Sequence, residues 1–525
     1  MTEENCLVVL EDSAGRNRWE KLGDVLRGIV PWAFPTKATP SAAPGGGKPP
    51  ELPWGLKTLK EGLDGFARSI VVEPRYICKD HRNLHSNFYS KKFKERPSAC
   101  ARLHFFSKAG LTQRQVSLDA ASLQDAYIGY SVIRPVKPAC LGRTIIDPHL
   151  VGKHNRDGFY SLRTGFKVNL NGQQLLVRGY PYTSQDGEAT VCAHAALWGV
   201  CRYLSERHTV YPETYPYDLI NMTTDTLGRT VPYRGMTYTD YSKILVNFGC
   251  HPEILFWAPG QITPNSSQPQ FMQLCAYVES GFPVLASYVG HVVSIVGHTM
   301  DRGKNPTPNA DGFIDSSAFL KQFIVVDDNY FPYQLLGLAN DPENYGKRYE
   351  DISKNQPAYH LDSIRVAVCP LPEKVFLPAA RGRAVLNALL KAFLQNSVLG
   401  PMLRGGTSEP LVTRVFITNS AAFKRRKLEK SLAGRQIMDP IGVKTAELHL
   451  PHFIWVMEIA PLSHYLQGRC TGEIVIDATS NFWETDLLYL RSGAILLLNG
   501  QRISANATGT NLGSFEQYTH NLGEM

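Results

Sequence analysis

The stretch QDGEATVCAHAALW, residues 185–198, places a cysteine where a glycine-containing loop gives way to an alanine-rich apolar run. The free N–H groups at a helix N-terminus carry partial positive charge, which favours the thiolate form of a cysteine. We therefore predict that Cys192 is a nucleophile and that its own backbone N–H can donate to a developing oxyanion. Apolar residues recur at helical spacing after it and predict a helix that begins at the cysteine: Ala193, Ala196, Leu197, Val200, Cys201 and Leu204.

A nucleophilic thiol needs a base, and His291 is the candidate among the histidines because it opens an apolar strand in GHVVSIVGH. The next apolar strand ends in FIVVDDN, which supplies Asp327 and Asp328. Adjacent strands would bring one of these carboxylates to the imidazole, where it would fix the tautomer of the base. Strand alternation does not choose between the two, and Asp327 is preferred.

Three further polar residues lie near these motifs. Gln185, seven residues before Cys192, is predicted to donate a side-chain hydrogen bond to the oxyanion. His298, seven residues after His291, is expected to be structural. His194 lies two residues after the cysteine and therefore on a different helix face, so we expect it to line the cleft or to pack in the core.

The order of these motifs resembles the papain-like cysteine peptidases, most closely the branch of bacterial peptidases that remove bacteriocin leader sequences. The segment GFPVLASYVGHVVSIVGH, 281–298, carries both the approach strand and the histidine strand. The segment RGMTYTDYSKILVNFG, 234–249, is similar to the middle helix of that branch. The resemblance covers residues 181–370 and implies thiolate attack on an amide carbonyl, with an acyl-enzyme intermediate.

Carried over residue by residue, the resemblance implies Cys192 as nucleophile, His291 as general base, Asp327 or Asp328 as orienting group and Gln185 as oxyanion donor. It implies no metal and no organic cofactor. Since the family usually places the glutamine six residues before the cysteine, the seven-residue spacing requires a small bulge in the loop. Residues 301–320, between the histidine and aspartate strands, are expected to form a surface-loop insertion.

The length of the chain predicts two or three domains, and composition suggests where they divide. The predicted fold class is α+β, with a papain-like core of a helical half and an antiparallel sheet, and the flanking domains frame the cleft. The predicted units are an appendage and Pro/Gly-rich linker at 1–65, a β-rich domain at 66–180, the peptidase domain at 181–370 and an α+β domain at 371–525.

Local signals place several elements. Asn171-Gly172 lies between alternating apolar arms and predicts a hairpin. Helices are predicted at 238–248, closed by Gly249, and at 269–280, with proline at the start and glycine just past the end. An amphipathic helix is expected in LPAARGRAVLNALLKAFLQ, a strand in RVFITN and a basic helix in FKRRKLEKSL. The runs HFIWVMEIA, GEIVIDA, LLYLRS and AILLLN are expected to form a sheet.

Composition narrows the class of protein. The hydrophobic share of 43% and charged share of 19% are ordinary for a globular protein, and the net charge of +8 is mild at this length. No C-x-x-C pair, secretory signal or long apolar window is found. We expect a cytoplasmic protein with reduced thiols and no membrane association.

Two basic stretches, 91–102 and 424–427, lie in no nucleic-acid-binding motif, so we expect solvated faces there and no nucleic-acid partner. The prediction is a bacterial cysteine peptidase that hydrolyses peptide or isopeptide bonds of a protein or peptide substrate. Three alternatives remain: an acyltransferase or deamidase using the same residues, a non-catalytic binding module that retains the fold, and a nucleic-acid-associated protein. No oligomeric state is predicted.

Overall fold

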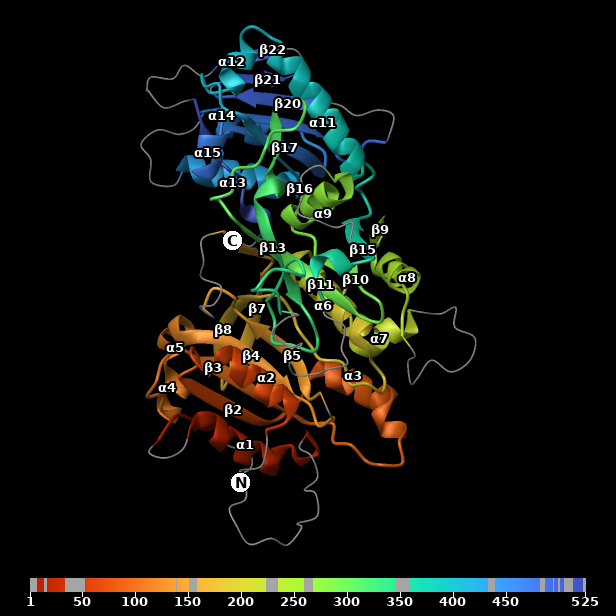
Figure 1. The fold of residues 1–525 in the computed structure, drawn as a ribbon. Helices are drawn as coiled ribbons and strands as arrows, with labels where there is room; N and C mark the ends of the chain where they lie inside the picture. The colour runs from red at the N-terminus through yellow and green to blue at the C-terminus, as the bar shows by residue number, and fades with distance from the viewer. Residues whose placement is uncertain are drawn as a thin grey trace.

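The computed structural model shows an α+β fold in which three main sheets follow one another along the long axis of the molecule (Figure 1). It describes residues 7–13, 17–33, 52–137, 139–150, 158–222, 235–258, 268–345, 359–432, 440–481, 487–493, 495–498, 501–504 and 513–522.

The N-terminal sheet is antiparallel, with strand order β1-β2-β3-β4-β5. Its strands are β1 (Val8–Leu10), β2 (Ser69–Tyr76), β3 (Cys100–Phe106), β4 (Tyr127–Ile133) and β5 (Leu141–Ile146). The helices of this region are α1 (Arg18–Ile29), α2 (Trp54–Leu63), α3 (Lys79–Asn87), α4 (Gln113–Leu118) and α5 (Ala120–Ala126), with short 3-10 turns η2 (Pro31–Ala33) and η3 (Tyr89–Lys91).

The described part of residues 1–65 is integral to this sheet and is not the appendage that we predicted. β1 pairs with β2, with Val8 opposite Val72. Helix α1 begins at a capping box made by Asn17 and Glu20, and it buries Trp19 completely in the core. An amphipathic helix with a capped start needs an apolar partner surface, and the sheet supplies it. Most of the predicted linker, 34–51, lies outside the described residues.

The hairpin at Asn171-Gly172 forms as predicted. It joins β7 (Thr164–Leu170) to β8 (Gln173–Gly179), and both turn residues have the positive φ values, 48° and 83°, that a tight two-residue hairpin turn requires.

The central sheet has the order β14-β13-β11-β10-β15-β9, with β6 pairing to β11. Its strands are β6 (Phe159–Ser161), β9 (Cys250–Phe256), β10 (Val284–Ser287), β11 (Val292–Met300), β13 (Leu320–Val326), β14 (Gln334–Leu336) and β15 (Val366–Pro372). The helices beside it are α6 (Cys192–Arg207), α7 (Pro216–Asn221), α8 (Tyr238–Phe248) and α9 (Pro269–Glu279), with η5 (Leu361–Ser363).

The C-terminal sheet has the order β12-β16-β17-β19-β20-β21-β22. Its strands are β12 (Phe313–Asp315), β16 (Leu411–Asn419), β17 (Phe453–Pro461), β19 (Gly472–Asp477), β20 (Leu487–Ser492), β21 (Ile495–Leu498) and β22 (Gln501–Ser504), and β18 (Arg469–Cys470) pairs separately with β23 (Phe515–Glu516). Its helices are α11 (Ala379–Leu394), α12 (Leu399–Leu403), α13 (Ser420–Leu432), α14 (Pro440–Glu447) and α15 (Leu462–Leu466), with η4 (Ser316–Phe319) and η6 (His520–Leu522) nearby in sequence or space.

Two strands cross the predicted domain boundaries. β6, from the segment predicted as the N-terminal domain, pairs with β11 in the central sheet. β12, from the predicted peptidase segment, pairs in parallel with β16, with Phe313 opposite Leu411. Residues 301–320 are therefore not a plain surface insertion as expected, because Phe313, Ile314 and Phe319 are buried against the C-terminal region.

No helix in the described ranges is both long enough and apolar enough to cross a lipid bilayer.

Candidate active site

Cys192 is the first residue of α6, as predicted, and its side chain is partly exposed. The other eight cysteines in the described ranges are buried. A residue at this position leaves its own N–H without an intrahelical acceptor, because the first four N–H groups of a helix have no partner within it. The thiol, the free N–H and the positive end of the helix dipole thus lie together.

His194 caps its own helix. The backbone N–H of Val191 donates to His194 Nδ1 at 3.2 Å, so the imidazole acts as an acceptor. Burial lowers the pKa of His194 to about 4, which keeps it neutral and able to accept. Of the two roles expected for this residue, packing holds and cleft lining does not, since only 1% of the side chain is exposed.

The loop before the cysteine is fixed by one carboxylate. Asp186 Oδ1 accepts the backbone N–H groups of Glu188, Ala189 and Thr190 at 2.8–2.9 Å. Thr190 Oγ1 in turn accepts the N–H of Asp186 at 3.2 Å. This closed set of contacts determines where α6 begins, and therefore where the sulfur of Cys192 lies.

The N-terminal region holds the same loop from outside. Arg134 donates to the backbone oxygen of Ser184 at 2.8 Å. Glu188 forms ion pairs with Lys92 and with Arg96, the latter at 2.6 Å. Part of the basic stretch at 91–102 is thus used inside the protein.

The second basic stretch is used in the same way. Lys427 Nζ lies 2.7 Å from Glu473 Oε2, and the side chain of Glu473 is fully buried. Lys427 is therefore not on the solvated face that we expected for this stretch, and the expectation of no nucleic-acid partner stays a prediction.

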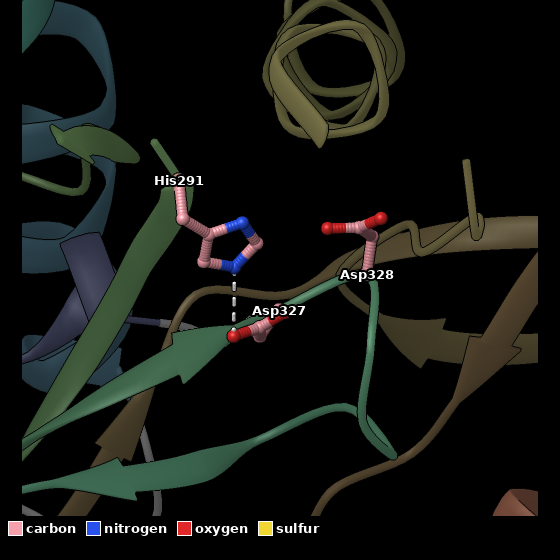
Figure 2. Close-up of side chains that lie close together, drawn as sticks. All are labelled: His291, Asp327 and Asp328. Carbon is pink, nitrogen blue, oxygen red and sulfur yellow. Dashed lines mark ion pairs between the residues drawn. The ribbon is translucent and has the colours of Figure 1, made fainter. Parts of the chain in front are cut away.

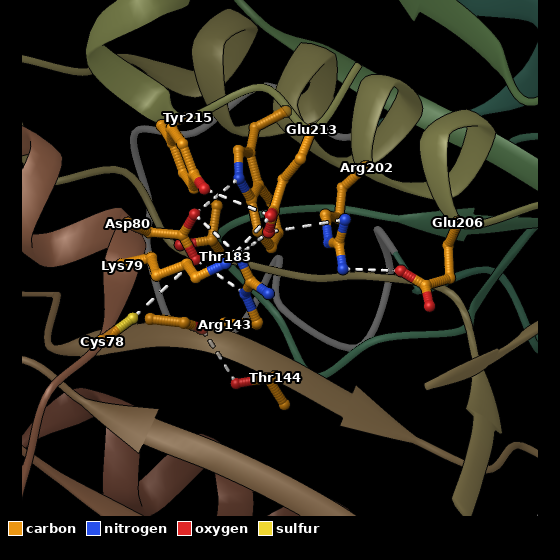
Figure 3. Close-up of polar contacts among 12 residues, drawn as sticks. Cys78, Lys79, Asp80, Arg143, Thr144, Thr183, Arg202, Glu206, Glu213 and Tyr215 are labelled. Carbon is orange, nitrogen blue, oxygen red and sulfur yellow. Dashed lines mark hydrogen bonds and ion pairs between the residues drawn. The ribbon is translucent and has the colours of Figure 1, made fainter. Parts of the chain in front are cut away.

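The middle of α6 is held by a set of charged residues that we call the N-terminal junction: Asp80, Arg143, Trp198, Arg202 and Glu213. Arg143 forms two hydrogen bonds to Asp80, at 2.8 and 3.0 Å, and lies 3.3 Å from Glu213 (Figure 3). Trp198 Nε1 donates to Asp80 at 3.2 Å, and Arg202 lies 3.5 Å from Glu213. These contacts join β5 and α3 to the helix that carries Cys192.

His291 directly precedes β11, in the turn after β10. The N–H of Tyr288 donates to the carbonyl of His291 at 2.8 Å, and Gly290 adopts a φ of 79°, which glycine allows without strain. Only 7% of His291 is exposed. His291 therefore lies at the end of a hairpin that is closed by a backbone hydrogen bond, at the strand end that the sequence predicts.

Asp327 follows β13, the neighbour of β11, and is fully buried. Its Oδ2 lies 3.0 Å from His291 Nε2 (Figure 2). Tyr345 donates to the same oxygen at 3.2 Å, and the Asn329 N–H donates to Oδ1 at 2.9 Å. The structure thus pairs His291 with Asp327 and not with Asp328.

The second ring nitrogen of His291 points away from Asp327 (Figure 2). Burial alone would lower the pKa of His291, but the charge and hydrogen bond of Asp327, together with a hydrogen bond to Cys192, hold it well above its usual range. The ring centroid of Tyr359 lies 4.8 Å from that of the His291 imidazole, with an interplanar angle of 32°, so Tyr359 packs against His291. His291 and Asp327 therefore form a buried ion pair, and Cys192 is near enough to contribute to the pKa of His291.

Asp328 points in a different direction from Asp327 (Figure 2). Its Oδ2 accepts the backbone N–H of Gln185 at 3.4 Å, whereas Oδ1 is buried with no hydrogen-bond partner in the described part of the chain. Burial and the neighbouring charge of Asp327 raise the pKa of Asp328 to about 7. Asp328 and Cys192 line one small pocket beneath α6, together with residues of β11 and the β8–α6 loop.

Gln185 is beside the site, but the contact that it makes is through its backbone. Its predicted role as a side-chain donor to the oxyanion stays a prediction.

His298 does not take part in the site. Its Nε2 lies 2.7 Å from Glu279 Oε1 on α9, and Glu279 also binds Arg414 on β16. Arg414 lies 2.9 Å from Glu458 as well. We call these four residues, His298, Glu279, Arg414 and Glu458, the C-terminal junction. The expectation that His298 is structural agrees with these contacts.

Tyr345 and Tyr359 are the residues at the site that the sequence reading missed. They hold Asp327 and cover His291, yet no spacing or motif marks them, because both come from the segment after β14, for which no element was predicted.

The donor atoms of His291, Asp327 and Asp328 all lie within 4.8 Å of one another, and no other group of three such residues is found in the described ranges. Imidazole and carboxylate groups at this spacing could hold a metal ion.

No protein-family model matches the chain, and a search of curated proteins gives no match.

Proposed function

We propose that this protein is a cysteine peptidase of papain-like fold that hydrolyses peptide or isopeptide bonds in protein or peptide substrates. Cys192 is the nucleophile, His291 the base and Asp327 the group that orients it. The observation that carries the proposal is the buried ion pair of His291 with Asp327, beside the helix that begins at Cys192 and packs on β11.

The reaction follows from these positions. His291 takes the thiol proton of Cys192, and the sulfur attacks the carbonyl carbon of the scissile bond. The C–N bond then breaks, and the imidazolium gives its proton to the leaving amine, which leaves a thioester on the enzyme. Water attacks the thioester while His291 takes one of its protons. Collapse releases the carboxylic acid and restores the thiol.

Two groups support the charged states. Asp327 holds the Nε2 side of the imidazole and stabilises the imidazolium, so the other nitrogen faces the sulfur. The free N–H of Cys192, at the start of α6, is available to the oxyanion of the tetrahedral intermediate. Tyr359 limits the access of water to the ion pair, which strengthens it.

The likeness to papain-like peptidases, and to the bacterial branch that removes bacteriocin leaders, is part of this proposal. It is supported by a cysteine-bearing helix packed on an antiparallel sheet whose adjacent strands carry the histidine and the aspartate. We also propose a cytoplasmic location, since the nine cysteines of the described ranges are free thiols, as is typical of reducing compartments.

Alkylation by iodoacetamide tests the proposal without a known substrate. We expect wild-type Cys192 to react faster than free cysteine, the Cys192→Ala protein to lose this label, and His291→Ala to slow it by about a hundredfold or more. His251→Ala is the matched control, because His251 is exposed on β9 outside the site and its loss should change nothing. Peptide mapping locates the label. An ordinary alkylation rate at Cys192, or an unchanged rate in His291→Ala, would defeat the assignment.

The acyl group of the thioester could be transferred to an amine instead of water, which is acyl transfer. The thioester could also form from the side-chain amide of a glutamine, which is deamidation after hydrolysis. Both reactions stay as the alternatives. Mass spectrometry of proteins incubated with the wild type, against Cys192→Ala, separates them. New termini identify peptide hydrolysis, a cross-link identifies acyl transfer, and conversion of an amide to an acid without chain cleavage identifies deamidation.

A further inference from the structure

Asp328 is a buried carboxyl group beside the proposed catalytic residues, and the hydrolysis described above does not use it. It follows Asp327 just after β13, but its side chain points in a different direction (Figure 2). Only 5% of the residue is exposed, and it lines the same small pocket as Cys192. Because burying a carboxyl group costs free energy, the contacts of Asp328 indicate what the fold gains from it.

Asp328 holds the β8–α6 loop, which leads to Cys192, at two points. Its side-chain Oδ2 accepts the backbone N–H of Gln185 at 3.4 Å. Its backbone oxygen accepts the hydroxyl of Tyr182, an almost fully buried residue earlier in the same loop, at 2.9 Å. The loop before the nucleophile is therefore attached to the end of the strand that precedes the orienting aspartate.

The neighbours of Gln185 on both sides are held by other contacts. The N–H and the hydroxyl of Ser184 both donate to the backbone oxygen of Leu141, at 3.0 and 2.8 Å. Asp186 accepts three backbone N–H groups of the segment that leads into α6. Gln185 lies between these two fixed residues, and the bond to Asp328 fixes its own backbone.

The backbone position of Gln185 matters if its side chain donates to the oxyanion, as the sequence predicts. Such a donor must lie about 3 Å from the place where the charge develops. A shift of about 1 Å in a group that positions the reaction can cost about a hundredfold in rate. A contact that fixes the backbone of the donor residue therefore acts on the rate of the reaction without touching the substrate.

Asp328 also lies near the base, with an oxygen within 4.8 Å of a ring nitrogen of His291. The two routes of action differ in what they affect. An effect through His291 would change every reaction of the Cys192 thiol. An effect through Gln185 would change only reactions that pass through an oxyanion.

We propose that Asp328 is a positioning residue, which holds the backbone of Gln185 so that the Gln185 side chain donates to the oxyanion of the substrate. The inference rests on the proposed function and deepens it. Asp328 takes no proton in the reaction and forms no bond with the substrate. Its contribution comes from an acceptor oxygen at the right place, so an amide oxygen there should serve as well.

Two reactions of Cys192 separate the two routes. Iodoacetamide alkylates the thiol at a saturated carbon and forms no oxyanion, whereas acylation by p-nitrophenyl acetate passes through one. The acylation rate is the p-nitrophenolate release of each protein beyond that of Cys192→Ala, and it is divided by the alkylation rate of the same protein. In Asp328→Ala we expect this ratio to fall by about tenfold or more.

Three further variants sharpen the test. Asp328→Asn should keep the ratio within about twofold of wild type, because its amide oxygen accepts the Gln185 N–H. Gln185→Ala should lower the ratio as Asp328→Ala does, and the double variant should lose no more than either single variant. Asp311→Ala is the matched control, because Asp311 is a partly exposed carboxylate paired with Lys391, and its ratio should match wild type.

Asp328→Ser, whose side chain is too short to reach the Gln185 N–H, repeats the measurement if Asp328→Ala does not fold. The inference is overturned if the ratio is unchanged in these variants, if Asp328→Asn falls as far as Asp328→Ala, or if the losses of the single variants multiply in the double variant. Each of these results, with fast alkylation of wild-type Cys192, leaves the peptidase in place. An ordinary alkylation rate in wild type defeats the proposed function itself.

Discussion

The two halves of the proposed catalytic pair are held by opposite ends of the molecule, and in different ways. The N-terminal junction holds α6, which carries Cys192, through several acids and bases. The C-terminal junction holds β11, which begins after His291, through His298 and Glu279 to Arg414. Both flanking regions are therefore parts of the site's support and not separate appendages.

The two junctions differ in their exposure to solvent and in the number of their cations. In the N-terminal junction the Glu213 side chain is 27% exposed, and Lys79 and Arg202 also pair with it. In the C-terminal junction Arg414 is the cation shared by Glu279 and Glu458, and all three side chains are no more than 6% exposed. The N-terminal junction should therefore tolerate the loss of one partner better than the C-terminal junction.

The largest effect is expected from Arg414→Met. This change leaves Glu279 and Glu458 buried without their shared partner, and loss of one member of a buried ion pair costs about 3–5 kcal/mol. Urea unfolding measures the free energy difference. Lys391→Met, which removes an exposed pair with Asp311, is the control and should cost less than about 1 kcal/mol. A similar, small cost for both variants would remove the contrast between the junctions.

The second largest effect is expected from acid, which should lower the stability that the C-terminal junction provides. Burial alone would raise the pKa of Glu279, but Arg414 and His298 hold it at about 2. Because the folded-state pKa lies below the ordinary value, the stabilisation is fully present above the unfolded pKa of about 4.3 and is lost as pH falls through about 2.

Urea unfolding at a series of pH values between these limits measures this loss. Glu279→Gln should be less stable than wild type near neutral pH and should show a shallower fall in acid. Equal slopes for the two proteins would contradict the assignment of Glu279 as the responsible carboxyl.

The smallest of the three effects is expected from Arg143→Met. In this variant Asp80 still accepts the Trp198 N–H, and Glu213 still pairs with Lys79 and Arg202. The free energy of unfolding should therefore fall by about 2 kcal/mol. The variant should also slow alkylation of Cys192 by several-fold, because α6 loses one of its anchors. A loss of unfolding free energy as large as that of Arg414→Met would show that the two junctions are equally sensitive to the loss of one partner.

The bounds of helices were predicted well where a glycine or proline in the sequence marks the end or the start of the helix. Helix α8 spans Tyr238–Phe248 and is closed by Gly249 at a φ of 104°, as expected from a glycine that follows the last apolar position. Helix α9 begins at Pro269, since proline at the first helical position has no N–H to satisfy.

The pairing of His291 with Asp327 could be predicted because each lies at the end of a strongly patterned strand, and the start of α6 at Cys192 could be predicted from the apolar stripe that follows it. The sequence favours Asp327 over Asp328 but does not decide between them, because the answer depends on which face of the strand points inward. The contact of the Gln185 backbone with Asp328 could not be predicted, because it depends on the path of a loop between two regions.

The predicted domain boundaries were the least successful part. β1 joins β2 across about 60 residues, and neither partner carries a local signal for the other. The same holds for Arg143 with Asp80 and for Arg414 with Glu279, whose pairing is decided only when distant elements pack together.

The parallel pairing of β12 with β16 has a consequence for how the protein is made. A ribosome releases Phe313 about a hundred residues before Leu411, so this apolar edge emerges long before its partner exists. A nascent chain paused after β15, or a fragment cut there, would present that open edge to other chains, and self-association would compete with correct folding.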